Sequence, residues 1–344
     1  MNTIIGLLVI AVGSLGQSSS YVPIKKVKKW SWESFWLVQG IFAWLVFPFL
    51  GTLLAIPEGI GLFEVWGAGG ALKSIIYGAL WGVGGLTFGL SMRYLGVALG
   101  QSIALGTCAA FGTLIPALLK GENLFRGNGL ILLIGISISI VGIAVIGYAG
   151  ALKSQNMSEE DKKKAVKEFA LKKGLLIALL AGVMSACFAL GLDAGAEIKA
   201  FTLLKGVDPL FAGLPIISLV TLGGFVVNAG YCLFQNARNK TFSDYTTSAN
   251  WVNNLLFCAL AGLCWYMQFF GLEVGKSFLG TSVILAFSWG ILQSFNVLFS
   301  NVWGILLKEW KGVGKKTITV LIIGLSILIF SVILVAKFKD LIEQ

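Results

Sequence analysis

Long apolar runs alternate with short charged segments along nearly all of this 344-residue chain. A helix of about 20 apolar residues spans the hydrocarbon core of a bilayer. The segments between the runs are too short to form a soluble domain. The sequence therefore predicts an all-α integral membrane protein with ten transmembrane helices. We expect these helices near residues 3–22, 34–56, 71–92, 97–119, 129–149, 174–196, 210–234, 251–270, 279–307 and 317–337.

The distribution of charge predicts how the helices are oriented. Hydrophobic residues make up 57% of the chain, charged residues make up 12%, and the net charge is +10. If the N-terminus faces outward, 18 of the 26 Lys and Arg residues fall in segments on the inner side. Because basic residues resist translocation, this bias predicts that both termini face outward. A basic nucleic-acid surface would not be divided among several loops, so we expect no nucleic-acid partner.

The longest predicted loop divides the chain into two halves of five helices each. We interpret residues 1–150 as a first five-helix repeat, 151–173 as a cytoplasmic connector and 174–344 as a second five-helix repeat. An odd number of helices per half makes the repeat inverted, an architecture that recurs in secondary transporters. Three pairs of short sequences recur in the same order in both halves. They are Gly6-Leu7-Leu8-Val9 with Gly174-Leu175-Leu176-Ile177, Gly96-x-x-x-Gly100-Gln101-Ser102 with Gly271-x-x-x-Gly275-Lys276-Ser277, and Gly135-x-Ser137 with Gly324-x-Ser326.

Glycines form a stripe along the third predicted helix, at Gly78, Gly82, Gly85 and Gly89. Such a stripe allows another backbone to approach closely. Tight static packing is one interpretation of it, and a surface on which helices slide is the other.

The ninth predicted helix carries polar and aromatic side chains along a single face. They are Ser282, Trp289, Gln293, Asn296, Ser300 and Trp303. Their spacing places them close to one line on a helix that turns about 100° per residue. An unpaired amide in hydrocarbon is costly, so this face must contact protein or a water-filled cavity.

Two other predicted helices carry similar sets, Trp265 with Gln268 and Ser14, Gln17, Ser18 with Tyr21. Interhelical hydrogen bonding explains any one of these residues taken alone. Amides both donate and accept hydrogen bonds, and aromatic rings cover the C–H surfaces of a sugar. Taken together, we interpret the three sets as the lining of a cavity between the halves for a neutral, polyhydroxylated solute. The candidate substrate-binding residues are Gln17, Tyr21, Trp265, Gln268, Trp289, Gln293 and Asn296.

Acidic side chains within the predicted helices are few. Asp193, near the outer end of the sixth helix, is the best candidate for a proton-coupling residue, and an interfacial carboxylate in water is the alternative. Glu33 opens the second helix beside two lysines, so we expect an interfacial ion pair there. Glu273 falls in the expected turn before the ninth helix, where we expect it to be solvated.

Metal and cofactor chemistry have no basis in the sequence. The chain contains no histidine, and its five cysteines lie within predicted helices without the paired spacing of a zinc site. We therefore expect no metal and no cofactor apart from a coupling proton.

Several motifs extend over essentially the full length of the chain. They are Tyr21-x-Pro23-x-Lys25-Lys26-Val27-Lys28-Lys29-Trp30-Ser31-Trp32-Glu33, Met92-Arg93-Tyr94-Leu95-Gly96, Gly206-Val207-Asp208-Pro209-Leu210, Leu214-Pro215, Trp265-Tyr266-x-Gln268-Phe269-Phe270, Ser288-Trp289 and Leu307-Lys308-Glu309-Trp310. These motifs resemble the bacterial L-rhamnose–proton symporter family, ten-helix members of the drug/metabolite transporter superfamily. The resemblance implies uptake of L-rhamnose or a related deoxyhexose, driven by an inward proton gradient across the bacterial cytoplasmic (inner) membrane.

Three other functions are alternatives to sugar uptake. An exporter of metabolites or drugs on the same fold is the main alternative, because no residue distinguishes uptake from efflux. An intramembrane enzyme would need a histidine, a metal cluster or paired catalytic carboxylates, so we do not expect an enzyme. A sensor would usually bring a soluble output domain. The exact sugar, the coupling stoichiometry and the oligomeric state stay open.

Overall fold

The computed structural model describes residues 3–95, 97–155, 171–247, 249–280, 283–308 and 310–342. These residues are helical apart from short turns, and no strand occurs among them. The all-α prediction is therefore confirmed for the part of the chain that is described. Most of the predicted cytoplasmic connector, residues 156–170, lies outside the described residues.

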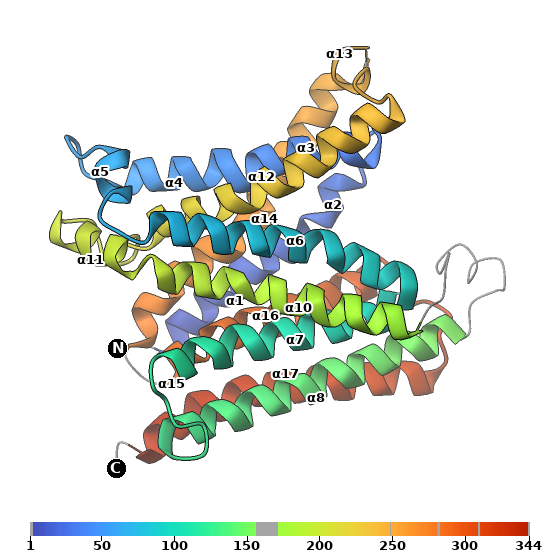
Figure 1. Cartoon of the computed structure of the whole chain (residues 1–344). Coiled ribbons are helices and arrows are strands. Elements are labelled where there is room, and N and C mark those ends of the chain that lie inside the picture. The colour runs from blue at the N-terminus through green and yellow to red at the C-terminus, as the bar shows by residue number, and fades with distance from the viewer. Residues whose placement is uncertain are drawn as a thin grey trace. The chain divides into compact units, whose positions relative to one another are not determined.

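Within the described residues, short connections join successive helices (Figure 1). They are α1 (Thr3–Ser19), α2 (Tyr21–Ile24), α3 (Trp32–Gly40), a π-helix (Ile41–Val46), α4 (Phe47–Ala55), α5 (Leu62–Trp66), α6 (Ala71–Leu95), α7 (Val97–Leu119), α8 (Gly127–Gln155), α10 (Leu171–Ala194), α11 (Ala196–Leu204), α12 (Leu214–Asn239), α13 (Asp244–Thr247), α14 (Trp251–Leu279), α15 (Val283–Ala286), α16 (Ser288–Leu306) and α17 (Lys315–Ile342).

Nine helical segments among the described residues are long and apolar enough to cross a bilayer. They correspond to nine of the ten predicted helices. The remaining one, predicted at 279–307, is split into α15 and α16, and the amides of α16 lower its mean hydropathy. The eighth helix ends at Leu279 rather than at the predicted residue 270. The count of ten transmembrane helices therefore stays a prediction.

The chain forms two compact units. Unit 1 contains the described parts of Val83–Ala189 and Leu279–Gln344, and unit 2 contains Ile4–Gly82 and Leu190–Phe278. Each unit thus combines segments of both predicted five-helix repeats. The boundaries fall inside α6 and α10, so these two helices contribute to both units.

In unit 1, α8 and α17 lie side by side (Figure 1). A Cβ atom at Gly142 would lie 3.0 Å from the Leu328 side chain, and a Cβ at Gly324 would lie 2.6 Å from that of Ile146. The two backbones therefore approach closely at these glycines. A hydrogen bond of 2.8 Å joins the hydroxyls of Ser139 and Ser331 across the same helix pair. Apolar residues that include Ile143, Ile146, Val297, Leu321 and Leu328 form the core here.

In unit 2, glycines bring α1 against α14 and α6 against α12. A Cβ atom at Gly271 would lie 2.9 Å from the Cα of Gly13, and a Cβ at Gly82 would lie 2.9 Å from the carbonyl oxygen of Gly224. Gly78 likewise lies against the backbone of Val220. For Gly78 and Gly82, the static-packing interpretation of the glycine stripe accounts for what is observed.

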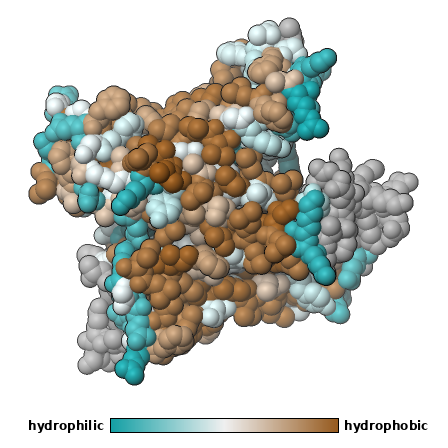
Figure 2. All heavy atoms as spheres, in the orientation of Figure 1, coloured by the Kyte–Doolittle hydropathy of each residue, from teal (hydrophilic) through white to brown (hydrophobic). Residues whose placement is uncertain are grey.

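Large apolar side chains are exposed along the outer faces of the helices (Figure 2). Examples are Leu54 and Leu72 in unit 2 and Ile322 and Phe330 in unit 1, all more than a third exposed. A soluble monomer rarely exposes contiguous apolar surface of this kind. The same surface is favourable in contact with lipid chains, as the sequence predicts.

Candidate functional site

Polar residues of α16 lie on one face of the helix and are buried within unit 1. Trp289, Gln293 and Asn296 each have less than a tenth of their surface exposed. The helical spacing therefore identified a shared face correctly. Ser300 and Trp303 lie further along α16 and are partly exposed, and Ser282 lies outside the described residues.

Contacts with α7 occupy the hydrogen-bonding groups of two of these residues. The indole N–H of Trp289 donates to the carbonyl oxygen of Cys108 at 3.3 Å, and the amide nitrogen of Gln293 lies 3.7 Å from the Cys108 sulfur. Gly112 leaves room for the Trp289 ring against α7, and Phe188 stacks on that ring at 5.6 Å between centroids. In this conformation, interhelical bonding satisfies these donors, each bond contributing about 0.6–2 kcal/mol.

The candidate residues of α14 lie in unit 2. Gln268 is buried, and its amide nitrogen donates to the carbonyl oxygen of Trp265 at 3.1 Å. Trp265 is partly exposed, and its ring lies 5.5 Å from the ring of Trp44 and 5.7 Å from that of Trp81, measured between centroids. We call Trp44, Trp81 and Trp265 the tryptophan triad. The sequence analysis singled out only one of its three members.

The candidate residues near the end of α1 are less enclosed. Gln17 is partly exposed, and its amide oxygen accepts a hydrogen bond of 3.3 Å from Ser18. Tyr21 begins α2 and is 55% exposed. The seven candidate residues are therefore divided between the units, with Gln17, Tyr21, Trp265 and Gln268 in unit 2 and Trp289, Gln293 and Asn296 in unit 1.

Two carboxylates of unit 2 differ from each other in burial. Asp193 lies in the last turn of α10 and is partly exposed. Glu273 is only 4% exposed, and its carboxylate accepts a hydrogen bond from the ammonium group of Lys199 on α11. The expectation of a solvated Glu273 is wrong, because α14 continues through it to Leu279 and Gly213 leaves room for the carboxylate.

A second ion pair lies in the neighbouring segments of unit 2. The Lys205 ammonium lies 2.8 Å from the Glu64 carboxylate, and both side chains are exposed. The hydrogen bond and charge of Lys205 lower the pKa of Glu64. Exposed pairs of this kind contribute little to stability. The pair of Lys199 with the buried Glu273 is the more consequential one, because removing the partner of a buried carboxylate strongly destabilises a fold.

Residues 25–34 bind residues 236–254 through a dense set of hydrogen bonds. We call this contact the inner clasp, after the side of the membrane on which the charge bias predicts both segments to lie. The side chain of Asn254 accepts from the Lys28 N–H at 2.9 Å and donates to the Lys28 carbonyl at 2.8 Å. The carboxylate of Asp244 accepts from the Ser31 N–H at 2.9 Å. Side chains thus satisfy backbone groups in the connection between α2 and α3.

Glu33 belongs to the inner clasp and does not have the surroundings expected for it. It is buried, and its carboxylate accepts hydrogen bonds of 2.9 Å from Asn239 and from Thr241. The described contacts of this carboxylate are thus with neutral donors, whereas the sequence suggested a lysine partner. The reason is tertiary, because residues more than 200 positions away fold over Glu33.

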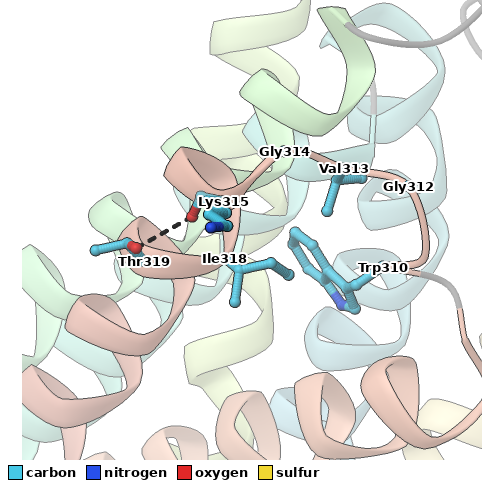
Figure 3. Close-up of a pocket in the computed structure, with 7 residues that line it drawn as sticks. All are labelled: Trp310, Gly312, Val313, Gly314, Lys315, Ile318 and Thr319. Carbon is cyan, nitrogen blue, oxygen red and sulfur yellow. Dashed lines mark hydrogen bonds between the residues drawn. The ribbon is translucent and has the colours of Figure 1, made fainter.

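A hollow of about 580 Å³ lies in unit 1 beside the start of α17 (Figure 3). Trp310 forms one wall and Ile318 faces it from α17. The ammonium group of Lys153 lies over the Trp310 ring, 4.8 Å from its centroid. None of the seven candidate residues lines this hollow.

Comparison with known proteins identifies the family. The model of the family described as L-rhamnose-proton symport protein matches residues 1–338. This chain belongs to that family. It is 35% identical over 331 residues to the L-rhamnose-proton symporter of Cronobacter sakazakii, with 94% of each chain covered. It is 34% identical over 335 residues to the L-rhamnose-proton symporters of Yersinia pestis and Yersinia pseudotuberculosis, with 95% of this chain and 96% of each relative covered.

Membership in the symport family confirms the resemblance seen in the motifs. The protein is a multi-pass transporter of a bacterial inner membrane and not an enzyme. The family description names symport and does not support the exporter alternative. The motif at residues 21–33, which is rich in lysine and tryptophan, supplies one side of the inner clasp.

The pH dependence of the inner clasp tests the role of Asp244. Burial raises the pKa of its carboxyl, but hydrogen bonds from the Ser31 N–H and from the Ser34 and Ser31 side chains outweigh burial, so the pKa lies below its ordinary value of 3.8. A carboxyl with a lowered folded pKa stabilises the fold above its unfolded pKa, and this contribution is lost as the pH falls through the folded value. We expect Asp244→Asn to lower the melting temperature in detergent at pH 6, with the difference from wild type shrinking below about pH 4.

Asp208→Asn is the matched control, because Asp208 is exposed and its carboxylate accepts only a local hydrogen bond, of 2.8 Å from the Leu210 N–H, among the described contacts. A gap between wild type and Asp244→Asn that stays constant from pH 7 to pH 3 would refute the assignment.

Proposed function

We propose that this chain takes up L-rhamnose or a related deoxyhexose together with protons, by alternating access. The observation that carries the proposal is membership in the L-rhamnose-proton symport protein family over nearly the full chain. Relatives that bear the symporter name share about a third of their residues with it. The proton is the only coupling ion that we propose, and no further cofactor.

The chemistry of the candidate residues suits a neutral sugar. They offer amides and indole N–H groups for hydroxyls and aromatic rings for C–H surfaces. None of the seven carries a charge, which a cationic or anionic solute would require. The proposed substrate-binding residues are Gln17, Tyr21, Trp265, Gln268, Trp289, Gln293 and Asn296.

We further propose ten transmembrane helices in an inverted 5+5 repeat, with both termini outward. Contacts within each unit support this topology, because they join loops that the charge bias assigns to one side. The inner clasp joins two segments assigned to the inner side. The Lys199–Glu273 and Lys205–Glu64 pairs join segments assigned to the outer side. In unit 1, Lys153 and Trp310 both belong to segments assigned to the inner side.

We propose Asp193 as a proton-coupling residue. Its partly exposed position in the last turn of α10 suits exchange of a proton with the outer solution. Symport requires a group whose protonation alters the free energy of one conformation relative to another. A carboxylate near the outer end of a transmembrane helix meets this requirement.

Purified protein in liposomes provides the direct test of transport. We expect labelled L-rhamnose to accumulate when the exterior is acidic relative to the lumen, and addition of L-rhamnose to weakly buffered vesicles to raise the external pH. A protonophore should abolish accumulation, because it removes the driving gradient. Uptake that is indifferent to the pH gradient, or no binding and no uptake of any 6-deoxy sugar, would overturn the proposed function.

The role of α16 in substrate binding predicts a loss of uptake on truncation of its polar face. We expect Trp289→Ala and Gln293→Ala each to reduce L-rhamnose uptake at least about tenfold, because each removes hydrogen-bonding groups worth on the order of 1 kcal/mol or more. Membrane insertion should be unchanged. Asn301→Ala is the control on the same helix, since the Asn301 amide donates to the Val297 carbonyl of its own helix. Wild-type uptake in both variants would remove α16 from the site.

The coupling role of Asp193 is separated from binding by comparing net transport with exchange. We expect Asp193→Asn to lose proton-driven accumulation and the sugar-induced pH change while retaining exchange of labelled for unlabelled L-rhamnose. Exchange needs no net proton movement, so it survives loss of the coupling group. The exposed Asp208→Asn variant serves as control. Undiminished accumulation in Asp193→Asn would show that the proton is carried elsewhere.

A further inference from the structure

The tryptophan triad brings together three rings from three separate helical segments of unit 2. Trp44 comes from the π-helix, Trp81 from α6 and Trp265 from α14. The ring centroids of Trp44 and Trp81 are 6.0 Å apart, those of Trp44 and Trp265 are 5.5 Å apart, and those of Trp81 and Trp265 are 5.7 Å apart. Each indole thus contacts both others. Trp44 is buried, whereas Trp81 and Trp265 are partly exposed.

All three indoles lie at mid-span. Trp44, Trp81 and Trp265 each fall within about one residue of the middle of the candidate spans Trp32–Ala55, Ala71–Ser91 and Trp251–Leu279. Tryptophan that anchors a helix in a membrane lies at the headgroup level, near a helix end. Anchoring therefore does not account for the triad. Solutes of secondary transporters bind near the bilayer midplane, and the middle of each candidate span is where these three residues lie.

The backbone around Trp44 departs from α-helical geometry. Residues Ile41–Val46 form a π-helix, in which the Phe47 N–H donates to the Phe42 carbonyl. Pro48 explains this turn, because it has no N–H to donate to the Trp44 carbonyl and its ring would crowd that carbonyl in an α-helix. Single π-helical turns occur frequently at functional sites. Here the turn determines where the Trp44 ring lies.

In the segment that runs from α3 into the π-helix, two buried polar atoms have no hydrogen-bond partner among the described residues. They are the indole nitrogen of Trp44 and the amide oxygen of Gln39, which precedes the π-helix in α3. Both residues are less than 5% exposed. One is a donor and the other an acceptor, and a sugar hydroxyl can serve both. Buried polar groups in proteins are almost always paired, and sugar hydroxyls would complete the pairing of these two atoms.

We propose that the tryptophan triad and Gln39 form a binding surface for the sugar. The partly exposed rings of Trp81 and Trp265 contact the C–H face and the methyl group of a 6-deoxyhexose. Gln39 and Trp44 pair with hydroxyls once the rings move apart to admit the sugar. The proposal rests on the proposed function and assigns three residues, Gln39, Trp44 and Trp81, that the sequence analysis did not select.

Selectivity for a deoxy sugar follows from this arrangement. L-Rhamnose and L-mannose differ only at carbon 6, which carries a methyl group in the first and a hydroxymethyl group in the second. An aromatic ring covers a methyl group without cost, whereas it leaves an added hydroxyl without a hydrogen-bond partner. The surface therefore favours L-rhamnose over L-mannose, and the preference depends on the rings.

The experiment measures binding and uptake of both sugars by the purified full-length protein. We expect Trp44→Phe, which keeps a ring but removes the N–H, and Gln39→Leu each to raise the dissociation constant for L-rhamnose about tenfold. We expect Trp81→Leu to reduce the preference for L-rhamnose over L-mannose by at least about tenfold. Trp81→Phe, which retains an aromatic ring, should preserve most of the preference for L-rhamnose. If the leucine variant does not fold, Trp81→Phe replaces it as the test at this position.

Trp30→Phe is the matched control. Its indole nitrogen also lacks a hydrogen-bond partner among the described residues, but the ring lies in the inner clasp, 5.9 Å from the ring of Tyr245. We expect this variant to bind L-rhamnose as wild type does. If wild type binds L-rhamnose and the Trp44, Gln39 and Trp81 variants match Trp30→Phe, the binding surface is refuted and the proposed function stands. If wild type neither binds nor transports a 6-deoxy sugar, the proposed function itself fails.

Discussion

Inside a bilayer, every polar group must find its partner within the protein, because hydrocarbon offers none. This constraint accounts for the helical fold, since an α-helix forms hydrogen bonds between its own backbone N–H and C=O groups. It also accounts for the places where side chains supply what the helices lack. At the inner clasp, Asn254 bonds both backbone groups of Lys28, and Asp244 caps the Ser31 N–H. Trp44 and Gln39 lack partners among the described residues, and the proposed sugar-binding surface would supply them.

The same constraint separates two kinds of buried polar residue in this protein. The indole of Trp289 on α16 donates to α7, and the amide nitrogen of Gln293 lies close to the Cys108 sulfur, so their groups are occupied without any solute. Trp44 and Gln39 in unit 2 carry groups that are not occupied among the described residues. A transporter must exchange protein–protein bonds for protein–sugar bonds as it changes conformation. We interpret Trp289 and Gln293 of α16 as residues whose interhelical contacts break during that exchange. We interpret the triad as a surface whose polar groups are paired only when sugar is bound.

Much of the fold followed from the sequence, and the errors have local causes. Nine predicted helices correspond to observed spans because hydropathy over about 20 residues is an additive property of a segment. The predicted eighth helix ends too early because a carboxylate such as Glu273 suggests a solvated turn, whereas the Lys199 partner and the space beside Gly213 accommodate Glu273 within a continuous helix. The sequence predicts one continuous helix over 279–307 because its apolar run has no interruption that would mark the break before α16. The shared face of Trp289, Gln293 and Asn296 was found because helical periodicity alone determines it.

The sequence by itself therefore determined the membrane environment, most helical spans, the polar face of α16 and the family, because each is a property of a continuous segment or motif. Only the tertiary structure decided which distant residues meet. It placed Trp44 and Trp81 beside Trp265, covered Glu33 with Asn239 and Thr241, and joined Lys199 to Glu273. Trp44 and Trp81 lie in otherwise apolar runs, so the sequence does not mark them until their rings are seen together with that of Trp265. The physical reason is that contacts between helices depend on close backbone approach and side-chain shape, which no single segment encodes.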